Sequence, residues 1–368
     1  MRVGTPGFLG ERLTEVREAR GLAQTALSEL TGIKSQSISH YEQGRQSPSP
    51  DALAQLCEKL RVPESHFRRA FPEYRSEGIF FPAYKPPDRA TRLKAERRFG
   101  WFKEIAAYVR AHVELSPLRV PRAAGDPAAA AARCRGILGL ADEPLGEVVL
   151  LIENMGCLVG RSGADIEAEG SYSQWDGDLP YVMLSEAAPP SRLRFDAAHE
   201  LGHLVMHRDA ALRQAADAET HRRIESEADR FARAFLLPAS TFGREVWAPT
   251  IDALVALKKV WNCPISEMIL RCGEIGVFDK DQTRRALVNY SRRGWKLREP
   301  HESDTDAEAP RLVARAIRIL IDQGGKHPHS VLTDLALAPH DIEDLTVLPR
   351  GYFASRSMPA ETMVRLRA

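Results

Sequence analysis

Two histidines four residues apart, with a glutamate directly after the first, form the segment of this sequence best suited to chemistry. His199, Glu200 and His203 lie in the string Phe195-Asp-Ala-Ala-His-Glu-Leu-Gly-His-Leu-Val-Met-His207. Apolar residues at helical spacing predict a helix here. Residues i and i+4 share one face of a helix, with Cβ atoms about 6 Å apart. Both imidazoles can therefore bind one zinc ion at a distance of about 2.0–2.1 Å.

Glu200 is rotated by about 100° around the helix from His199, too far to be the natural third ligand. Its carboxylate can instead face a water molecule on the ion. Zinc lowers the pKa of such a water to about 7, and a carboxylate can accept its proton during attack on a peptide carbonyl. The H-E-x-x-H pattern therefore predicts a metallopeptidase with Glu200 as its general base.

A second string supplies further acidic groups. It runs Glu225-Ser-Glu-Ala-Asp229-Arg-Phe-Ala-Arg-Ala-Phe-Leu-Leu-Pro238, and it predicts a helix that ends before Pro238. Glu225 and Asp229 share one face of that helix. In the thermolysin-like class of peptidases, a Glu on a following helix is the third zinc ligand and an Asp four residues later orients a ligating histidine. A hydrogen bond from the free imidazole nitrogen to Asp229 fixes the tautomer of that histidine.

Three neighbouring groups compete for the role of third ligand. His207 lies about 12 Å along the helix axis from His199, so one ion cannot bind it together with both motif histidines. We interpret His207 as a group at the helix end or behind a ligand. Glu227 faces nearly the opposite side from Glu225 and is expected to be solvated. His221, one turn before Glu225, is the weakest of these alternatives.

The two strings closely resemble the ImmA/IrrE family of metallopeptidases. The matching pieces are the run from Arg194 to His203 and the run from Glu225 to Pro238, and the resemblance extends over roughly residues 135–300. It implies a small zincin fold with a mixed sheet and an active-site helix, in which His199, His203 and Glu225 bind the metal and Glu200 is the catalytic base. Relatives often carry Asn at the position of Asp229, and both residues can accept the imidazole hydrogen bond. Characterised relatives relieve repression by cutting a helix-turn-helix repressor.

Three segments that precede His199 are rich in β-forming residues: Glu147–Ile152, Cys157–Arg161 and Leu179–Leu184. In zincins, a strand at the lip of the cleft pairs with the extended substrate through backbone groups. We expect Tyr181, Val182, Met183 and Leu184 to form this substrate strand, with a plain internal strand as the alternative.

The stretch Phe8–Phe67 shows a closely spaced helical pattern. A helix ends at Gly21, and further helices are predicted over Ala23–Leu30, Ser35–Glu42 and Asp51–Leu60. Two short helices joined by a turn at Gly32 predict a DNA-binding helix-turn-helix, whose second helix reads the major groove. Side chains suited to base edges or phosphates follow this pattern: Gln24, Lys34, Gln36, Ser37, Ser39, His40 and Arg45.

This stretch closely resembles the Xre family of phage-repressor-like helix-turn-helix domains over about 60 residues. The resemblance rests on Leu13, Arg17, Gly21, Gln24, Leu27, Ile33, Ile38, Tyr41, Glu42, Gly44, Pro48, Leu53 and Leu56. It implies binding to double-stranded DNA, generally as a homodimer on inverted repeats. A helical protein-interaction domain of the same fold is the alternative.

Composition and charge agree with a multidomain protein. The chain has 368 residues, with 43% hydrophobic and 27% charged residues, which is ordinary for globular proteins. Residues 1–103 carry 18 Lys and Arg against 12 Asp and Glu, a net charge of +6 within a total of +1, as expected of a part that binds nucleic acid. Lys85–Lys103 holds 7 basic and 2 acidic residues; it either lies on DNA or forms a solvated helix face.

We therefore expect an α+β multidomain fold: an all-α helix-turn-helix domain, a zincin-like mixed sheet with the H-E-x-x-H helix, and a helical carboxy-terminal region. The expected boundaries are residues 1–72 for the DNA-binding domain, 73–132 for a connector, 133–300 for the metallopeptidase and 301–368 for the helical region. Helices are predicted over Ile251–Cys272, Arg311–Asp322, Val331–Leu337 and Asp341–Phe353. The five scattered cysteines predict free thiols. The absence of a signal segment or of a long apolar run predicts a cytoplasmic protein without membrane contact.

The leading hypothesis is a DNA-binding transcriptional regulator with a zinc endopeptidase that cuts a repressor or another protein, in stress response or mobile-element control. Zinc fits the ligand set best, while manganese or iron are alternatives. Two other hypotheses remain open at this point. One is a transcription factor whose peptidase fold senses a ligand or peptide without hydrolysis; the other is a toxin–antitoxin or phage-defence component. Self-cleavage in the connector Phe71–Pro87 is a further prediction.

Overall fold

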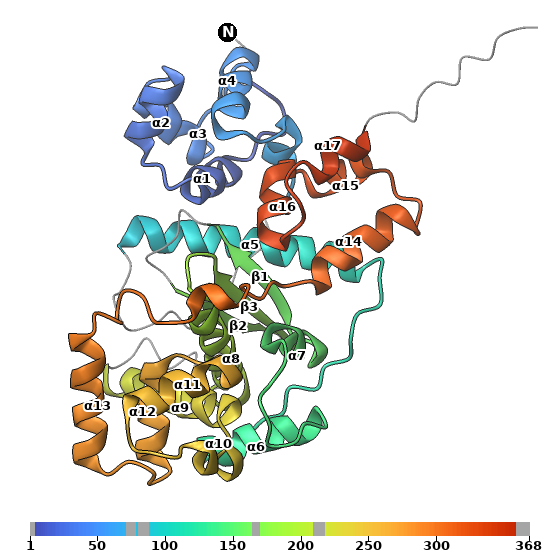
Figure 1. Cartoon of the computed structure of the whole chain (residues 1–368). Helices are drawn as coiled ribbons and strands as arrows, with labels where there is room; N and C mark the ends of the chain where they lie inside the picture. Colours follow the sequence, from blue (N-terminus) through green and yellow to red (C-terminus); the bar gives the residue numbers. More distant parts are fainter. Residues whose placement is uncertain (1–3, 71–78, 80–87, 164–169, 209–217, 358–368) are drawn as a thin grey trace, which may run out of the picture. The chain divides into compact units, whose positions relative to one another are not determined.

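A computed structural model describes residues 4–70, 79, 88–163, 170–208 and 218–357. The chain forms two compact units (Figure 1). The first unit comprises Met1–Tyr74, Pro87–Glu114 and Val313–Ala368, and the second comprises Arg75–Pro86 and Leu115–Leu312. The predicted boundaries at residues 72, 132 and 300 stay predictions. The connector Phe71–Pro87, for which self-cleavage is predicted, lies outside the described residues except for Ile79.

The first unit begins with the predicted helix-turn-helix. Its elements are α1 (Gly10–Ala19), α2 (Gln24–Thr31), α3 (Ser35–Glu42), α4 (Pro50–Leu60) and the 3-10 turn η1 (Glu64–Arg68). Gly32 ends α2 with a φ of 70°, a conformation that glycine adopts without strain. The hydroxyl of Ser49 accepts a hydrogen bond from the amide of Ala52 and so caps α4. The buried faces of these helices form one small core around Leu13, Leu27, Ile38 and Leu56.

The basic segment belongs to the core of the first unit. It forms α5 (Arg89–Arg110), which is capped by Asp88 and buries Phe99, Trp101 and Phe102. Arg98 and Lys103 are also buried. The expectation that this segment lies on DNA or forms a solvated face is therefore wrong for the face that carries these residues. The number of charges in this segment does not reveal the burial of Arg98 and Lys103, because long basic side chains can cover apolar neighbours with their stems.

The remaining helices of the first unit come from the end of the chain: α14 (Leu312–Asp322), α15 (Pro328–Leu335), α16 (Pro339–Thr346) and α17 (Tyr352–Ser357). The prediction of one helix over Asp341–Phe353 is wrong. Val347 takes a φ of 58° at the end of α16, and Pro349 follows, so the chain turns there before α17 begins.

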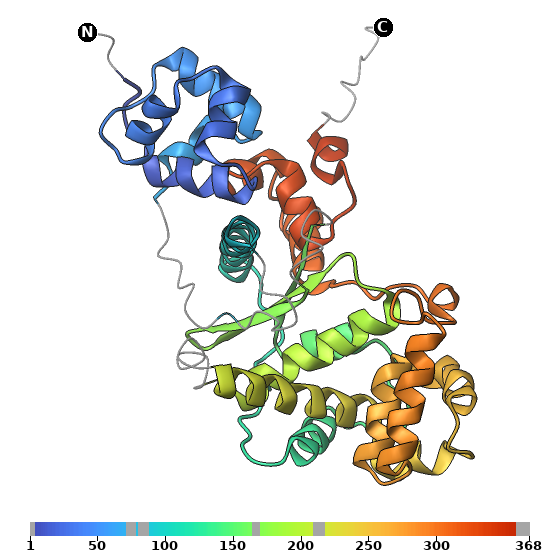
Figure 2. The same cartoon turned by 90° about the vertical axis from the view of Figure 1, so that its left-hand side faces the viewer.

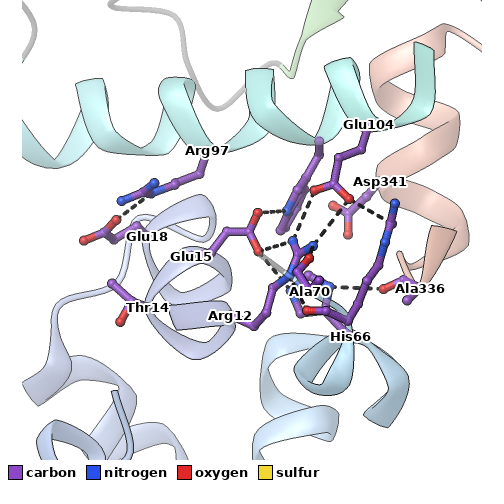
Figure 3. A network of polar contacts seen from close by, with 12 residues as sticks. Arg12, Thr14, Glu15, Glu18, His66, Ala70, Arg97, Glu104, Ala336 and Asp341 are labelled. Atoms are coloured by element: carbon purple, nitrogen blue, oxygen red, sulfur yellow. Dashed lines mark hydrogen bonds and ion pairs between the residues drawn. The ribbon is translucent and has the colours of Figure 1, made fainter. Parts of the chain in front are cut away.

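Buried polar contacts join these distant segments (Figure 3). On α1, the guanidinium of Arg12 donates to Glu15 at 2.7 Å and to Glu104 of α5 at 3.1 Å. The indole of Trp101 donates to the other oxygen of Glu15 at 3.0 Å. Nδ1 of His66 lies 3.1 Å from the carbonyl oxygen of Ala336, at the end of α15. The core of the first unit is thus built from three separate stretches of the sequence.

The second unit contains a mixed sheet of three strands, β1 (Leu158–Ser162), β2 (Tyr172–Asp176) and β3 (Leu179–Ser185). The order is β1-β3-β2, with β1 parallel and β2 antiparallel to the central β3. The predicted strand over Glu147–Ile152 is instead the helix α7 (Val148–Asn154). A short apolar run does not distinguish a strand from a buried helix. Here Val148, Val149 and Ile152 are buried while Leu150 is exposed, which is a helical pattern.

Helices pack against this sheet and continue beyond it: α6 (Pro127–Ile137), α8 (Pro190–Met206), α9 (Ala218–Leu236), α10 (Ala239–Glu245), α11 (Ile251–Trp261), α12 (Ile265–Glu274) and α13 (Lys280–Arg292). Helix α8 contacts β2 and β3 on one side and α9 on the other (Figure 2). The single helix predicted over Ile251–Cys272 is two helices, because Asn262 takes a φ of 42° and Pro264 follows it. The mostly helical, multidomain architecture with a small mixed sheet confirms the predicted fold class.

The segment after α13 ties together two helices of the second unit. The carboxylate of Glu302 accepts from the amide and hydroxyl of Ser191, in the first turn of α8. Glu308 contacts Arg194 of α8 and accepts from the amide of Val149 in α7. These acidic groups satisfy helix amides that have no partner within the helix. The amino-terminal ends of α7 and α8 are thereby fixed.

Among the described helices, none combines the length and the apolar character that crossing a bilayer requires.

Candidate metal centre

His199 and His203 of α8 and Glu225 of α9 come together in the second unit. One ligand atom from each side chain lies within 4.8 Å of the other two. Nε2 of His203 is 3.0 Å from Nε2 of His199 and 3.3 Å from a carboxylate oxygen of Glu225. Nε2 of His199 is 3.6 Å from the other oxygen of Glu225. Three donor atoms from two helices thus converge on one point.

The close approach of α8 to α9 depends on Gly202, which lies between the two histidines. A Cβ atom at this position lies 3.0 Å from the ring of Phe231 and 3.3 Å from the Cα of Ala228, both on α9. Phe231 is fully buried and stacks on Phe235 at a ring distance of 5.9 Å. The bare backbone of Gly202 therefore lets α9 come close enough for Glu225 to reach the histidines.

Asp229 orients the first histidine. Nδ1 of His199 lies 2.9 Å from a carboxylate oxygen of Asp229. An ionised carboxylate only accepts hydrogen bonds, so Nδ1 carries a proton, and in the neutral imidazole Nε2 is left with its lone pair toward the cluster. Burial disfavours the imidazolium, but Asp229 and Glu225 outweigh it and hold the pKa of His199 well above its ordinary value.

The second histidine has a different neighbour. Nδ1 of His203 lies 3.1 Å from Nδ1 of His207, whose Nε2 lies 2.9 Å from a carboxylate oxygen of Glu227. His207 follows the last residue of α8, at the helix end as predicted. Glu227 is partly exposed, and its carboxylate also pairs with both His207 and Arg223. Burial lowers the pKa of His203 to about 4.

The predicted base, Glu200, is buried between α8 and the sheet. One of its carboxylate oxygens accepts a hydrogen bond of 2.6 Å from the hydroxyl of Ser173 in β2. Burial raises the pKa of Glu200 to about 8, since a low-dielectric environment disfavours the charged form. Ser173 lies 27 residues before Glu200, and no local spacing in the sequence connects it to the motif.

The cluster fits a divalent metal ion. Both imidazoles present Nε2 toward the carboxylate of Glu225, and Oε1 of Glu225 is buried without a hydrogen-bond partner. An unpaired buried carboxylate oxygen is unfavourable unless a cation satisfies it. Two imidazole nitrogens with one carboxylate form the three-ligand set of a catalytic zinc site, in which the fourth position stays open. His221 does not belong to the group among the described residues.

The predicted substrate strand does not fit the sheet. Tyr181, Val182, Met183 and Leu184 lie in the central strand β3, whose backbone pairs with β1 on one side and β2 on the other. A peptide cannot add to a strand that already has two neighbours. The alternative of a plain internal strand describes β3 correctly.

The predicted DNA-reading residues gather around α3. Lys34, Gln36 and Arg45 are exposed, and Ser37, Ser39 and His40 are partly exposed. Gln24 opens α2, and its amide nitrogen donates to Glu42 at 2.6 Å. The guanidinium of Arg17 donates to both oxygens of Glu42, at 2.5 and 3.1 Å. The end of α3 is therefore anchored through Glu42 by Arg17 and Gln24, contacts that the sequence pattern alone did not show.

Two family comparisons agree with these sites. Residues 9–70 match the helix-turn-helix domain family, and residues 152–271 match the IrrE N-terminal-like domain of the M78 peptidase family. The chain combines a helix-turn-helix domain with an IrrE N-terminal-like domain. A comparison with curated proteins gives no match. The two resemblances predicted from the motifs are confirmed.

The IrrE N-terminal-like match contains every group of the metal cluster. It begins in α7, spans the sheet with Ser173, and includes α8 and α9 in full before it ends in α12. The helix-turn-helix match ends at residue 70, before α5. A metallopeptidase-like domain with a His-His-Glu metal site thus lies in the same chain as a helix-turn-helix domain, which implies DNA binding.

Proposed function

We propose that this protein is a DNA-binding regulator whose IrrE N-terminal-like domain hydrolyses a peptide bond in a protein target. The observation that carries the proposal is the complete set of groups on α8 and α9: His199, His203 and Glu225 as ligands, with the buried Glu200 beside them. A domain that only binds a peptide does not need a buried carboxylate at this position. A helix-turn-helix repressor is the favoured target, in stress response or mobile-element control.

Each side chain has a defined task in this proposal. A zinc ion, when bound, supplies the Lewis acidity that polarises a carbonyl and acidifies water. Glu200 accepts the proton of the attacking water and returns it to the leaving amine. Ser173 holds one oxygen of Glu200, so that the other oxygen faces the reacting atoms. Burial raises the pKa of Glu200, so its ionised form is a stronger base toward water and its protonated form can then pass the proton on.

The DNA-binding part of the proposal rests on the exposed side chains around α3. Gln36 can read a base edge through its amide, while Lys34 and Arg45 suit phosphates. We propose double-stranded DNA as the ligand, bound by a homodimer. Substituting Lys34 or Arg45 by Ala is expected to weaken binding to all sequences, whereas Gln36→Ala is expected to relax sequence preference.

The test of the peptidase begins with metal content. Elemental analysis of the purified wild-type protein is expected to give about one zinc per chain, and His203→Ala is expected to lose it. Incubation with candidate repressors, followed by mass spectrometry of the fragments, then tests cleavage. Glu200→Gln is expected to keep the metal and to abolish cleavage. Wild-type protein without metal would exclude the peptidase.

A second outcome separates hydrolysis from sensing. If zinc binds but wild type and Glu200→Gln regulate the same promoter equally in cells, and no cleaved target is found, the domain senses a peptide or ligand without cutting it. Zinc binding with a mapped scissile bond excludes the sensor hypothesis.

A further inference from the structure

A chain of polar contacts reaches the second metal ligand from behind. It runs from Arg223 to Glu227 on α9, then to His207 beyond the end of α8, and ends at His203. The distances are 2.9 Å from Arg223 Nη1 to Glu227 Oε1, 2.9 Å from Glu227 Oε2 to His207 Nε2, and 3.1 Å from His207 Nδ1 to His203 Nδ1. His207 and His203 are buried, so this chain leads from the surface into the site.

The direction of these hydrogen bonds follows from the chemistry of the groups. A carboxylate has only acceptors, so His207 must donate to Glu227 through Nε2. A neutral imidazole carries one proton, and Nδ1 of His207 is then an acceptor. The hydrogen between the two rings must therefore belong to His203 at Nδ1. With its proton there, His203 presents the lone pair of Nε2 toward His199 and Glu225.

We infer that His207 and Glu227 are positioning residues that fix His203 in the Nδ1-protonated tautomer, the only neutral form in which Nε2 can bind the metal. This inference rests on the proposed metal-dependent function. Neither residue is a ligand, since His207 contacts His203 on the side away from the cluster.

The two motif histidines reach the same state by different means. His199 donates directly to Asp229, whereas His203 donates to an imidazole that itself donates to Glu227. Helix α9 thereby supplies three carboxylates with separate tasks: Glu225 at the cluster, Asp229 behind His199 and Glu227 behind His207. Glu227 can reach His207 although it lies on another face of α9 from Glu225, because α8 ends at Met206 and His207 turns away from the helix.

Zinc binding should then depend on position 207 only through a hydrogen-bond acceptor for the Nδ1–H group of His203. Asn places Oδ1 close to the position of the imidazole Nδ1 and can accept from His203, whereas Ala cannot. Zinc affinity, measured by chelator competition, is expected to fall about 10- to 100-fold in His207→Ala. It is expected to stay within about threefold of wild type in His207→Asn, since the bond to His203 is kept.

Reversing the direction of the hydrogen bonds between residues 227, 207 and 203 gives a sharper test. Lysine at position 227 offers a donor to Nε2 of His207, which moves the proton of His207 to Nδ1 and makes it a donor to His203. Glu227→Lys is therefore expected to reduce zinc affinity as much as His207→Ala, while Glu227→Gln, which keeps an acceptor, is not. Ser226→Lys, which introduces the same side chain at an exposed neighbouring position, is the control and is expected to bind zinc like wild type.

The tautomer can be read without metal or substrate. Long-range proton–nitrogen NMR spectra of the metal-free wild-type protein are expected to show His203 protonated at Nδ1, and His207→Ala is expected to show loss of that preference. A wild-type His203 protonated at Nε2, or equal zinc affinity in His207→Ala and wild type, overturns the inference. If zinc does not bind at all, the proposed function fails, while the NMR result still decides the role of His207.

Discussion

The guanidinium of Arg20 and the carboxylate of Asp341 form two hydrogen bonds, of 2.6 and 2.7 Å, although 321 residues separate them in the chain. Arg20 follows the last residue of α1 and Asp341 lies on α16. The side chain of Asp341 is 1% exposed, and the guanidinium of Arg98 on α5 lies 3.5 Å from the same carboxylate. The buried carboxylate of Asp341 thus pairs with arginines from two other segments of the first unit.

Replacing this acid is expected to destabilise the first unit. Asp341→Ala leaves two largely buried guanidinium groups without their carboxylate, and removal of one partner of a buried ion pair costs about 3–5 kcal/mol. Urea unfolding monitored by tryptophan fluorescence measures the change, because Trp101 lies in this core. Asp344→Ala, on the same helix but partly exposed, is the control. Equal midpoints for the two variants would contradict the role of Asp341.

Gly202 gives a prediction for the helix pair that carries the metal ligands. The methyl group of Gly202→Ala meets the ring of Phe231 at 3.0 Å, so α8 and α9 must move apart. Overpacking of this kind costs about 1–3 kcal/mol, and zinc affinity is expected to fall with it because Glu225 moves away from the histidines. Thermal unfolding and chelator competition measure both effects.

Gly136 of α6 provides the matched control for this substitution. It is also helical, but a Cβ atom there meets nothing within 4 Å. Gly136→Ala is expected to stabilise the protein by about 0.5–1 kcal/mol through helix propensity. Destabilisation by both substitutions would show that space at Gly202 is not the cause.

Glu153 gives a pH-dependent prediction. Its carboxylate is 2% exposed, and burial raises its pKa to about 7, although the amides of Arg311 and Leu312 donate to it. The unfolded chain releases this proton near pH 4.5, so the folded state binds it more tightly. The stability that this proton gives is complete below pH 4.5 and is lost as the pH rises to 7, by an amount of about 3 kcal/mol.

Glu153→Gln removes this titration and keeps an acceptor for both amides. The variant is therefore expected to be more stable than wild type at pH 8, and the difference is expected to shrink toward pH 5. Denaturant midpoints of both proteins at the two pH values measure it, since all other titrating groups are shared. Glu147→Gln, at a half-exposed carboxylate, serves as the control. A constant difference between wild type and Glu153→Gln would exclude the raised pKa.

Asp229 gives a prediction for the first histidine. Asp229→Ala removes the acceptor behind His199, and loss of such a partner reduces metal affinity by about 10- to 100-fold. Asp229→Asn keeps an acceptor oxygen 2.9 Å from Nδ1 in the unchanged geometry and is expected to bind zinc within about threefold of wild type, which such a retained bond allows. Zinc affinity by chelator competition distinguishes the two. An equally large loss in both variants would mean that the charge of Asp229 matters more than its hydrogen bond.

The sequence predicts the metal cluster well because helix periodicity places His199 and His203 on one face, and the family resemblance names Glu225 as the third ligand. It does not predict Ser173, His207's contact with Glu227, or the central position of Tyr181–Leu184. These depend on how distant segments pair. The strand error at Glu147–Ile152 has the same origin, since a short apolar run is compatible with both structures until its neighbours are known.

The separation of Arg20 from Asp341 has a consequence for synthesis on the ribosome. The helix-turn-helix is translated before Glu104, Ala336 and Asp341, which complete its surroundings. A nascent chain that stops before Val313 contains all the predicted DNA-reading side chains and the whole metal cluster, but Arg20 lacks its acid and His66 lacks the carbonyl of Ala336. The helix-turn-helix is therefore completed only after the whole metal cluster has been translated.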